Sequence, residues 1–197
     1  NNYNLLDKSM WSVNWEKKID YIEYQFSQMS KKYKNINEGI NYYLGIWENA
    51  ISYYNDNVIL KQEVKFVCHK RLGINTDLLE FLNPLNFVVD YKERDIGDYL
   101  KSYIINEKYT FDKLKNILNK LSHDKNDASR LITRIMFPSF YFDKYEEIII
   151  NEEDDKSILL FNTKTDNYED FLRFIFNYYK NLGLPYLTWL FENKKED

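Results

Sequence analysis

The chain is poor in the residues that build disulfides, metal sites and phosphate-binding loops. Its 197 residues include one cysteine, two histidines, five glycines and three prolines. A lone cysteine, Cys68, excludes a disulfide within the chain, and with only His69 and His123 beside it the sequence predicts no zinc site. The glycines are scattered, so no segment resembles the glycine-rich loops that hold phosphates with backbone N–H groups.

Long apolar runs and an excess of positive charge are also missing. No run approaches the roughly 18 to 20 apolar residues that span a bilayer, and the start of the sequence lacks the order of a secretory signal. The formal net charge is −4, and acidic and basic residues are interleaved. The sequence therefore predicts neither a membrane nor a nucleic-acid partner, and a reducing cytoplasm is the expected location.

Hydrophobic and aromatic side chains are abundant instead, at 44% and 18% of the chain. A chain of this size buries enough apolar surface to fold on its own core. Apolar residues recur at steps of three and four over 11–33 and again from Ile40 to Tyr54, which predicts two helices packed antiparallel. Asn35 or Asn37 is the expected cap of the second helix. We expect the contact between the two helices to bury four side chains, Trp11, Trp15, Trp47 and Ile51.

The periodicity changes in the middle of the chain. Two short runs rich in Val and Phe, residues 63–70 and 83–93, predict two strands that flank a loop with a helical turn at 77–82. Helical periodicity returns from residue 94 onward. The predicted fold is therefore mainly α, with one small β element around residues 63–91.

Helix-capping residues and a proline in the second half of the chain predict where one of its helices begins and ends. Asp127 or Ser129 is the expected cap of one helix, and Pro138 should kink or end it. The acidic stretch at 151–157 is predicted to be a solvated loop.

The order of these elements resembles the large lobe of kinase-like phosphotransferases, in particular the aminoglycoside phosphotransferase and choline kinase branch. In that branch a His-Gly-Asp loop supplies the catalytic base, an Asn five residues later binds Mg²⁺, and a later Asp that closes an apolar strand binds it too. The resemblance places His69 at the first position and Asp90 at the last. It places Arg71 where the base should be and Thr76 where the Asn should be. An arginine accepts no proton and repels a metal ion, so the loop is degenerate and Asp90 is only a vestigial metal ligand.

A structural interpretation of the same residues stands beside this one. A histidine that ends a buried strand is usually a hydrogen-bonded structural residue, and an aspartate after an apolar run is usually a turn former. We expect Asp90 to lie near His69 and to form an ion pair with Arg71.

Two more arginines lie four residues apart on one predicted helix face, Arg130 and Arg134. They form either an anion site or ion pairs with Glu146, Glu147 or a carboxylate of 151–155, and pairing is the favoured interpretation.

Five separated blocks carry a more specific resemblance, to the YutH/CotS-type spore coat proteins of endospore-forming bacteria, which belong to the aminoglycoside phosphotransferase superfamily. The resemblance covers roughly residues 8–192. The blocks occur in the expected order, at residues 35–56, 69–72, 86–101, 129–148 and 184–192.

This resemblance implies a noncatalytic spore coat-associated protein, made in the mother cell cytoplasm and then found in the coat, with other coat proteins as partners and no cofactor. Residues 1–197 would form a single kinase-like C-terminal lobe, without the small ATP-binding lobe. One alternative is a phosphotransferase in which Asp77 or Asp90 replaces the base and an upstream lobe supplies Mg-ATP binding. Another is a regulatory pseudokinase that binds a nucleotide or sugar phosphate without turning it over.

Overall fold

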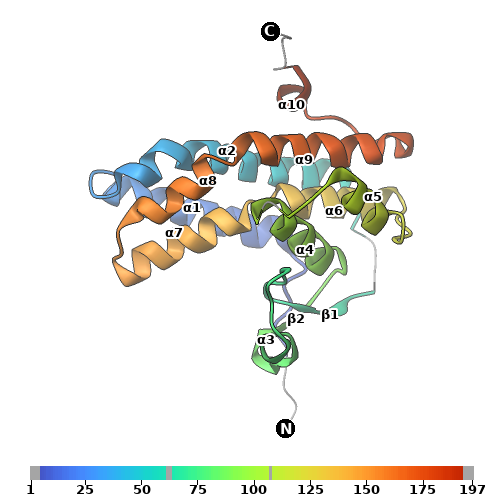
Figure 1. Cartoon of the computed structure of the whole chain (residues 1–197), viewed down its shortest axis with the longest axis horizontal. Helices are drawn as coiled ribbons and strands as arrows, with labels where there is room; N and C mark the ends of the chain where they lie inside the picture. The colour runs from blue at the N-terminus through green and yellow to red at the C-terminus, as the bar shows by residue number, and fades with distance from the viewer. Residues whose placement is uncertain (1–4, 61–63, 107, 193–197) are drawn as a thin grey trace.

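Two long helices begin the fold of the protein, a computed structural model that describes residues 5–60, 64–106 and 108–192 (Figure 1). α1 spans Trp11–Met29 and α2 spans Lys34–Asn57, and the short link between them turns the chain back so that the two helices pack together, as predicted. The remaining helices are α3 (Leu78–Leu82), α4 (Glu93–Ile105), α5 (Phe111–Leu118), α6 (Lys125–Met136), α7 (Ser139–Asn151), α8 (Leu159–Asn162), α9 (Thr165–Tyr178) and α10 (Thr188–Glu192). None of the helices in these ranges is both long enough and apolar enough to cross a membrane.

The prediction that α6 stops at proline is confirmed, but its start lies earlier than expected. α6 ends at Met136 and α7 begins immediately after Pro138. The cap of α6 is Asp124, whose carboxylate accepts the N–H of Asp127 at 2.8 Å. Asp127 and Ser129, the expected caps, therefore lie inside the helix.

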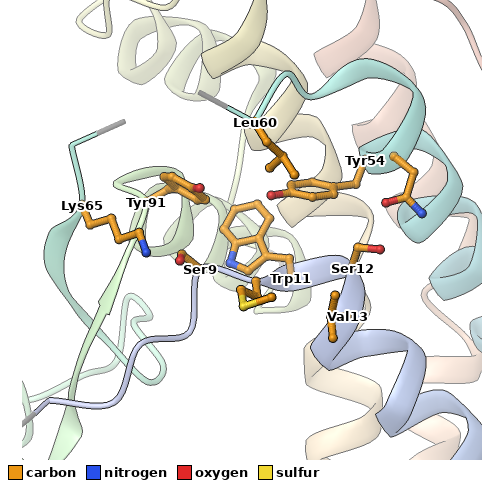
Figure 2. Close-up of a pocket in the computed structure, with 10 residues that line it drawn as sticks. Ser9, Trp11, Ser12, Val13, Tyr54, Leu60, Lys65 and Tyr91 are labelled. Atoms are coloured by element: carbon orange, nitrogen blue, oxygen red, sulfur yellow. The ribbon is translucent and has the colours of Figure 1, made fainter. Parts of the chain in front are cut away.

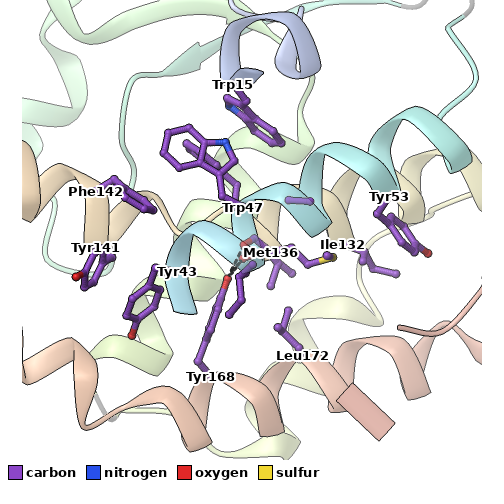
Figure 3. Close-up of a cluster of buried hydrophobic side chains, with 14 of the residues drawn as sticks. Trp15, Tyr43, Trp47, Tyr53, Ile132, Met136, Tyr141, Phe142, Tyr168 and Leu172 are labelled. Carbon is purple, nitrogen blue, oxygen red and sulfur yellow. Dashed lines mark hydrogen bonds between the residues drawn. The ribbon is translucent and has the colours of Figure 1, made fainter. Parts of the chain in front are cut away.

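The core lies where α2, α6 and α9 pack together, and aromatic rings fill much of it (Figure 3). Trp47 on α2 is fully buried, and Trp11 and Trp15 are 1% and 6% exposed, as predicted. Ile51 is half-buried. Phe137, at the junction of α6 and α7, lies between two of the tryptophans: its ring centroid is 4.3 Å from that of Trp15 and 4.9 Å from that of Trp47. The predicted contact between α1 and α2 therefore also includes Phe137, from the junction of α6 and α7.

The buried hydroxyl group of Tyr168 in this core is matched to a backbone carbonyl that a helix end leaves without a partner in the helix. Tyr168 on α9 is 2% exposed, and its hydroxyl donates to the carbonyl oxygen of Met136 at 3.0 Å (Figure 3). Met136 is the last residue of α6, where carbonyl groups have no partner within the helix. The tyrosine thus joins α9 to the end of α6 and satisfies a polar group that would otherwise be buried unpaired.

The start of α2 is capped from a distance rather than by Asn35 or Asn37. The carboxylate of Asp155 accepts the backbone N–H groups of Asn35 and Ile36 at 2.8 and 3.2 Å. Asp155 is 7% exposed, so the prediction that 151–157 is a solvated loop is wrong at this position. A negative charge at a helix N-terminus satisfies free N–H groups and the helix dipole together, which explains why this acidic residue is buried.

The predicted β element is a two-stranded antiparallel hairpin of β1 (Phe66–His69) and β2 (Phe87–Asp90). Phe66 pairs with Asp90 and His69 pairs with Phe87. The segment around Asp7 runs along the other edge of β2, because the N–H of Lys8 donates to Val89 at 2.8 Å and Val89 donates back to Leu6 at 2.9 Å. Figure 1 shows the hairpin and α3 on the side of the helical body opposite α10.

Candidate functional site

Arg94 connects the two strand ends that carry the predicted site residues. β2 ends at Asp90 and α4 begins at Glu93, so Arg94 lies in the first turn of the helix and its side chain returns to the hairpin. Its guanidinium donates to the carbonyl oxygens of His69 at 2.7 Å and Lys70 at 2.9 Å, and to the Asp90 carboxylate at 2.7 Å. A planar group with several donors can hold three acceptors in one plane, which fixes the hairpin against α4.

The Asp90 carboxylate is completely enclosed. One oxygen accepts the indole N–H of Trp11 and the backbone N–H of Tyr91, both at 2.8 Å, and the other accepts Arg94. Asp90 is 0% exposed. A metal ion would have to displace these donors and then share the site with a buried guanidinium.

Arg71 does not pair with Asp90, so that part of the sequence prediction is wrong. Its partner is Asp143 on α7. One carboxylate oxygen lies 2.6 Å from Nη2 of Arg71, and the other accepts a hydrogen bond from Nε. The side chains of Arg71 and Asp143 are 41% and 39% exposed. The buried Asp90 takes the cation that can be buried with it, Arg94, while Arg71 stays at the surface, where desolvation costs less.

His69 and Thr76 both have structural partners. The Nδ1 atom of His69 is 2.7 Å from the Asp95 carboxylate, Nε2 is 3.2 Å from the carbonyl oxygen of Phe81, and the rings of His69 and Phe81 are stacked at 4.5 Å. The Thr76 hydroxyl accepts the N–H of Gly73 at 2.9 Å and closes the turn of the loop. These contacts fit the structural interpretation of the loop.

A buried charge cluster lies behind the loop, between α4 and α6. Arg134 donates two hydrogen bonds to Asp98, at 3.0 and 2.7 Å, and Lys101 lies 3.1 Å from the same carboxylate. Lys101 also donates to the carbonyl of Phe137 at 2.8 Å, and burial lowers the pKa of its ammonium to about 7. A Cβ atom on Gly97 would lie 2.7 Å from Cγ of Arg134, so the close approach of the two helices requires glycine there.

Arg130 and Arg134 form ion pairs, as favoured, but with other partners than predicted. Arg130 contacts Glu93 at 3.3 Å and Asp127 at 2.6 Å, and Arg134 contacts Asp98. The arginines of α6 face α4, because the two helices pack directly on each other, whereas Glu146 pairs with Lys18 of α1 at 2.9 Å.

Cavities border several of these side chains. One of about 530 Å³ is bordered by Lys70, Arg94 and Trp11, and one of about 270 Å³ by Gly73, Lys101 and Ser102; both are also lined by Arg71 and Asp143. A third, of about 440 Å³, is also lined by Trp11. Figure 2 shows the rings of Tyr54 and Tyr91 beside that of Trp11, with Lys65 at the rim.

The sequence analysis missed Arg94, Asp95 and Asp143, as well as Asp98 and Lys101 of the buried cluster. Arg94 lies four residues after Asp90, and that spacing was a usable signal for an ion pair. Asp143 lies 72 residues from Arg71, and no local pattern joins them. Across the described ranges, no three His, Cys, Asp or Glu side chains are grouped so that they would hold a metal ion.

Comparison with known proteins gives the family of the chain. Residues 3–175 match the family described as "Spore coat putative kinase YutH". The chain belongs to this YutH family. It is 26% identical over 208 residues to the endospore coat-associated protein YutH of Bacillus subtilis (strain 168), an alignment that covers 91% of the chain and 61% of that relative. The chain thus spans about three fifths of the length of this YutH relative, and no solved structure matches it.

Proposed function

We propose that the protein acts in the spore coat as a noncatalytic component built on the large lobe of a kinase-like fold. The observation that carries this proposal is the enclosure of Asp90 by Trp11, Tyr91 and Arg94. A phosphotransferase needs carboxylate oxygens that are open to Mg²⁺ on the phosphates. Here the only carboxylate at the corresponding place in the sequence has both oxygens engaged and none of its surface exposed.

The loop supports the same proposal. Arg71 stands at the position of the base, and a guanidinium has no acceptor for the proton of a substrate hydroxyl. Thr76, at the position of the metal-binding Asn, is engaged in the turn of the loop. The protein would then require no cofactor, and its role would rest on the surfaces that it offers to other coat proteins.

One observation favours the alternative, a phosphotransferase that uses Mg-ATP. Asp143 is 39% exposed and lines both cavities beside Arg71, so a carboxylate is present in the cleft although the sequence places none there. Both of its oxygens accept hydrogen bonds from the Arg71 guanidinium, so neither is free to take a substrate proton, which weighs against a role as a general base. Asp77, the other candidate, accepts the N–H of Glu80 at 2.8 Å as the cap of α3.

A localisation experiment separates a coat role from a role in turnover. A tagged protein expressed during sporulation should be extracted with the coat fraction of purified spores. The variants Arg71→Ala and Asp143→Ala should fractionate in the same way and should restore the coat properties of a deletion strain, because no catalytic step is required. Loss of function in Asp143→Ala with normal localisation would contradict the proposal and favour the phosphotransferase.

A further inference from the structure

The larger cavity beside Arg71 has many positively charged side chains in its lining. Six basic residues border it, and among the described residues that line it Asp143 alone carries a carboxylate. The six are Lys8, Lys18, Lys70, Arg71, Arg94 and Arg134. They come from five separate parts of the chain: the segment before α1, α1 itself, the loop after β1, the first turn of α4, and α6.

Pairing with nearby carboxylates neutralises only part of this charge. Four of the six cations have a carboxylate partner: Arg71 with Asp143, Arg94 with Asp90, Arg134 with Asp98 and Lys18 with Glu146. Lys8 and Lys70 are exposed, and no carboxylate in the described ranges forms an ion pair with either ammonium. Six cations against four carboxylates leave an excess of two positive charges at the cavity.

The neighbouring cavity shows that this excess is local. The cavity of Figure 2 is lined by Trp11, Tyr54 and Tyr91, and its one ammonium, that of Lys65, is paired with Asp7 at 2.6 Å. Trp11 lines both cavities, yet only the 530 Å³ cavity has basic side chains without a carboxylate partner among the described residues. The difference points to a ligand for one cavity and not to a general surplus of lysine on this face.

We propose that the 530 Å³ cavity binds a small oxyanion with two or more negative charges, such as the phosphate groups of a phosphorylated metabolite, without a metal ion. Ammonium and guanidinium groups are the side chains that bind phosphate oxygens most strongly. A cleft with low-dielectric walls concentrates their field, and here the rings of Trp11, Trp15 and Phe137 supply such walls. This inference rests on the proposed function only in that Asp90 remains closed to Mg²⁺.

Pyrophosphate is a suitable probe because it has the negatively charged phosphate groups of such a ligand but no organic part that could bind elsewhere. The unmodified protein should bind sodium pyrophosphate in EDTA, measured by calorimetry and by the change in tryptophan fluorescence expected from Trp11 and Trp15. Lys8→Gln with Lys70→Gln should weaken binding about tenfold or more, because two cations that lose no protein partner are removed. The matched control is Lys115→Gln with Lys120→Gln. It removes one exposed lysine on α5 and one exposed lysine just after α5, neither of which lines the cavity, so this variant should bind pyrophosphate like the unmodified protein.

A gain-of-affinity variant guards against simple loss of folding. Asp143→Asn removes the carboxylate that lines the cavity and should tighten pyrophosphate binding several-fold, an effect that a damaged fold cannot produce. Absence of binding by the unmodified protein, or equal weakening by the control pair, would overturn the inference and leave the proposed function untouched. Binding that requires Mg²⁺ would overturn both.

Discussion

Asp90 and Arg94 form a buried ion pair, with 2.7 Å between the carboxylate oxygen and Nη1, at the place where the hairpin joins α4. The same guanidinium holds the carbonyl groups of His69 and Lys70. Asp90, which the resemblance makes only a vestigial candidate for a metal ligand, thus has structural partners on both oxygens. Arg94 joins the loop, the second strand and the following helix.

Replacement of Arg94 by Met should destabilise the protein strongly. The change leaves the Asp90 carboxylate buried without its cation, which costs about 3 to 5 kcal/mol in the free energy of unfolding. Arg71→Met is the matched control, because it breaks an exposed pair worth less than about 1 kcal/mol. Urea denaturation measures both variants, and Asp90→Asn in the Arg94→Met background should recover part of the loss. Equal losses for the two single variants would show that the buried pair is not the anchor.

Replacement of Asp155 by Ala should remove the cap of α2. The carboxylate satisfies two backbone N–H groups at the start of the longest helix, so its loss should lower stability by roughly 0.5 to 2 kcal/mol. Glu153→Ala, two residues away and exposed, should change stability by less than about 0.5 kcal/mol. If thermal unfolding gives the same shift for both, the acidic segment acts only through its general charge.

Trp47 should contribute more to stability than an exposed aromatic residue on α1. Truncation of this fully buried side chain to Ala should cost on the order of 3 to 5 kcal/mol, because it leaves a cavity between Phe137 and Phe142. Tyr24→Ala, at a site that is 69% exposed, is the control and should be nearly neutral. A loss below about 1 kcal/mol for Trp47→Ala would contradict this prediction and would mean that neighbouring side chains move to fill the cavity.

Glu93 should make stability fall as the pH rises. Burial raises the pKa of its carboxyl from 4.5 to about 7, although Lys92 lies 3.8 Å and Arg130 3.3 Å from its oxygens. A raised pKa in the folded state stabilises the protein fully below pH 4.5, and this contribution is lost between pH 4.5 and about 7.

The variant Glu93→Gln removes that titration. It should be more stable than the unmodified protein at pH 8, by on the order of 2 kcal/mol, with little difference near pH 4.5. Glu23→Gln, at an exposed position of α1, should show no such dependence. Urea midpoints at the two pH values decide the matter: an equal effect at both would show that Glu93 stays ionised across the range.

The helices and the hairpin could be predicted from the sequence because each depends on local periodicity. The stripe from Ile40 to Tyr54 needs only the 3.6-residue repeat, and the runs that contain His69 and Asp90 need only β-branched and aromatic residues between turn signals. The partners of charged residues could not be predicted in the same way. Asp155 caps a helix 120 residues earlier in the chain, and contacts over such separations are set by packing.

The charged face of α4 explains the remaining errors at the site. Of the apolar side chains of α4, Leu100 and Ile104 are buried and Ile96 and Tyr103 are half-buried, while the charged Asp98 and Lys101 are 6% and 3% exposed. α4 packs against an α6 that carries Arg130 and Arg134, so the buried side of the helix holds ion pairs beside the apolar Leu100 and Ile104. A hydrophobic stripe cannot reveal an interface built from ion pairs.

Titration with ATP in the presence of either Mg²⁺ or EDTA tests most directly whether the site is closed to metal-dependent chemistry. Calorimetry on the unmodified protein, and on Arg71→Asp combined with Thr76→Asn, should show no gain in affinity when Mg²⁺ replaces EDTA, because Trp11, Tyr91 and Arg94 keep both oxygens of Asp90 engaged. Mg²⁺-dependent binding by the unmodified protein that Asp90→Ala abolishes would contradict the account and favour the phosphotransferase.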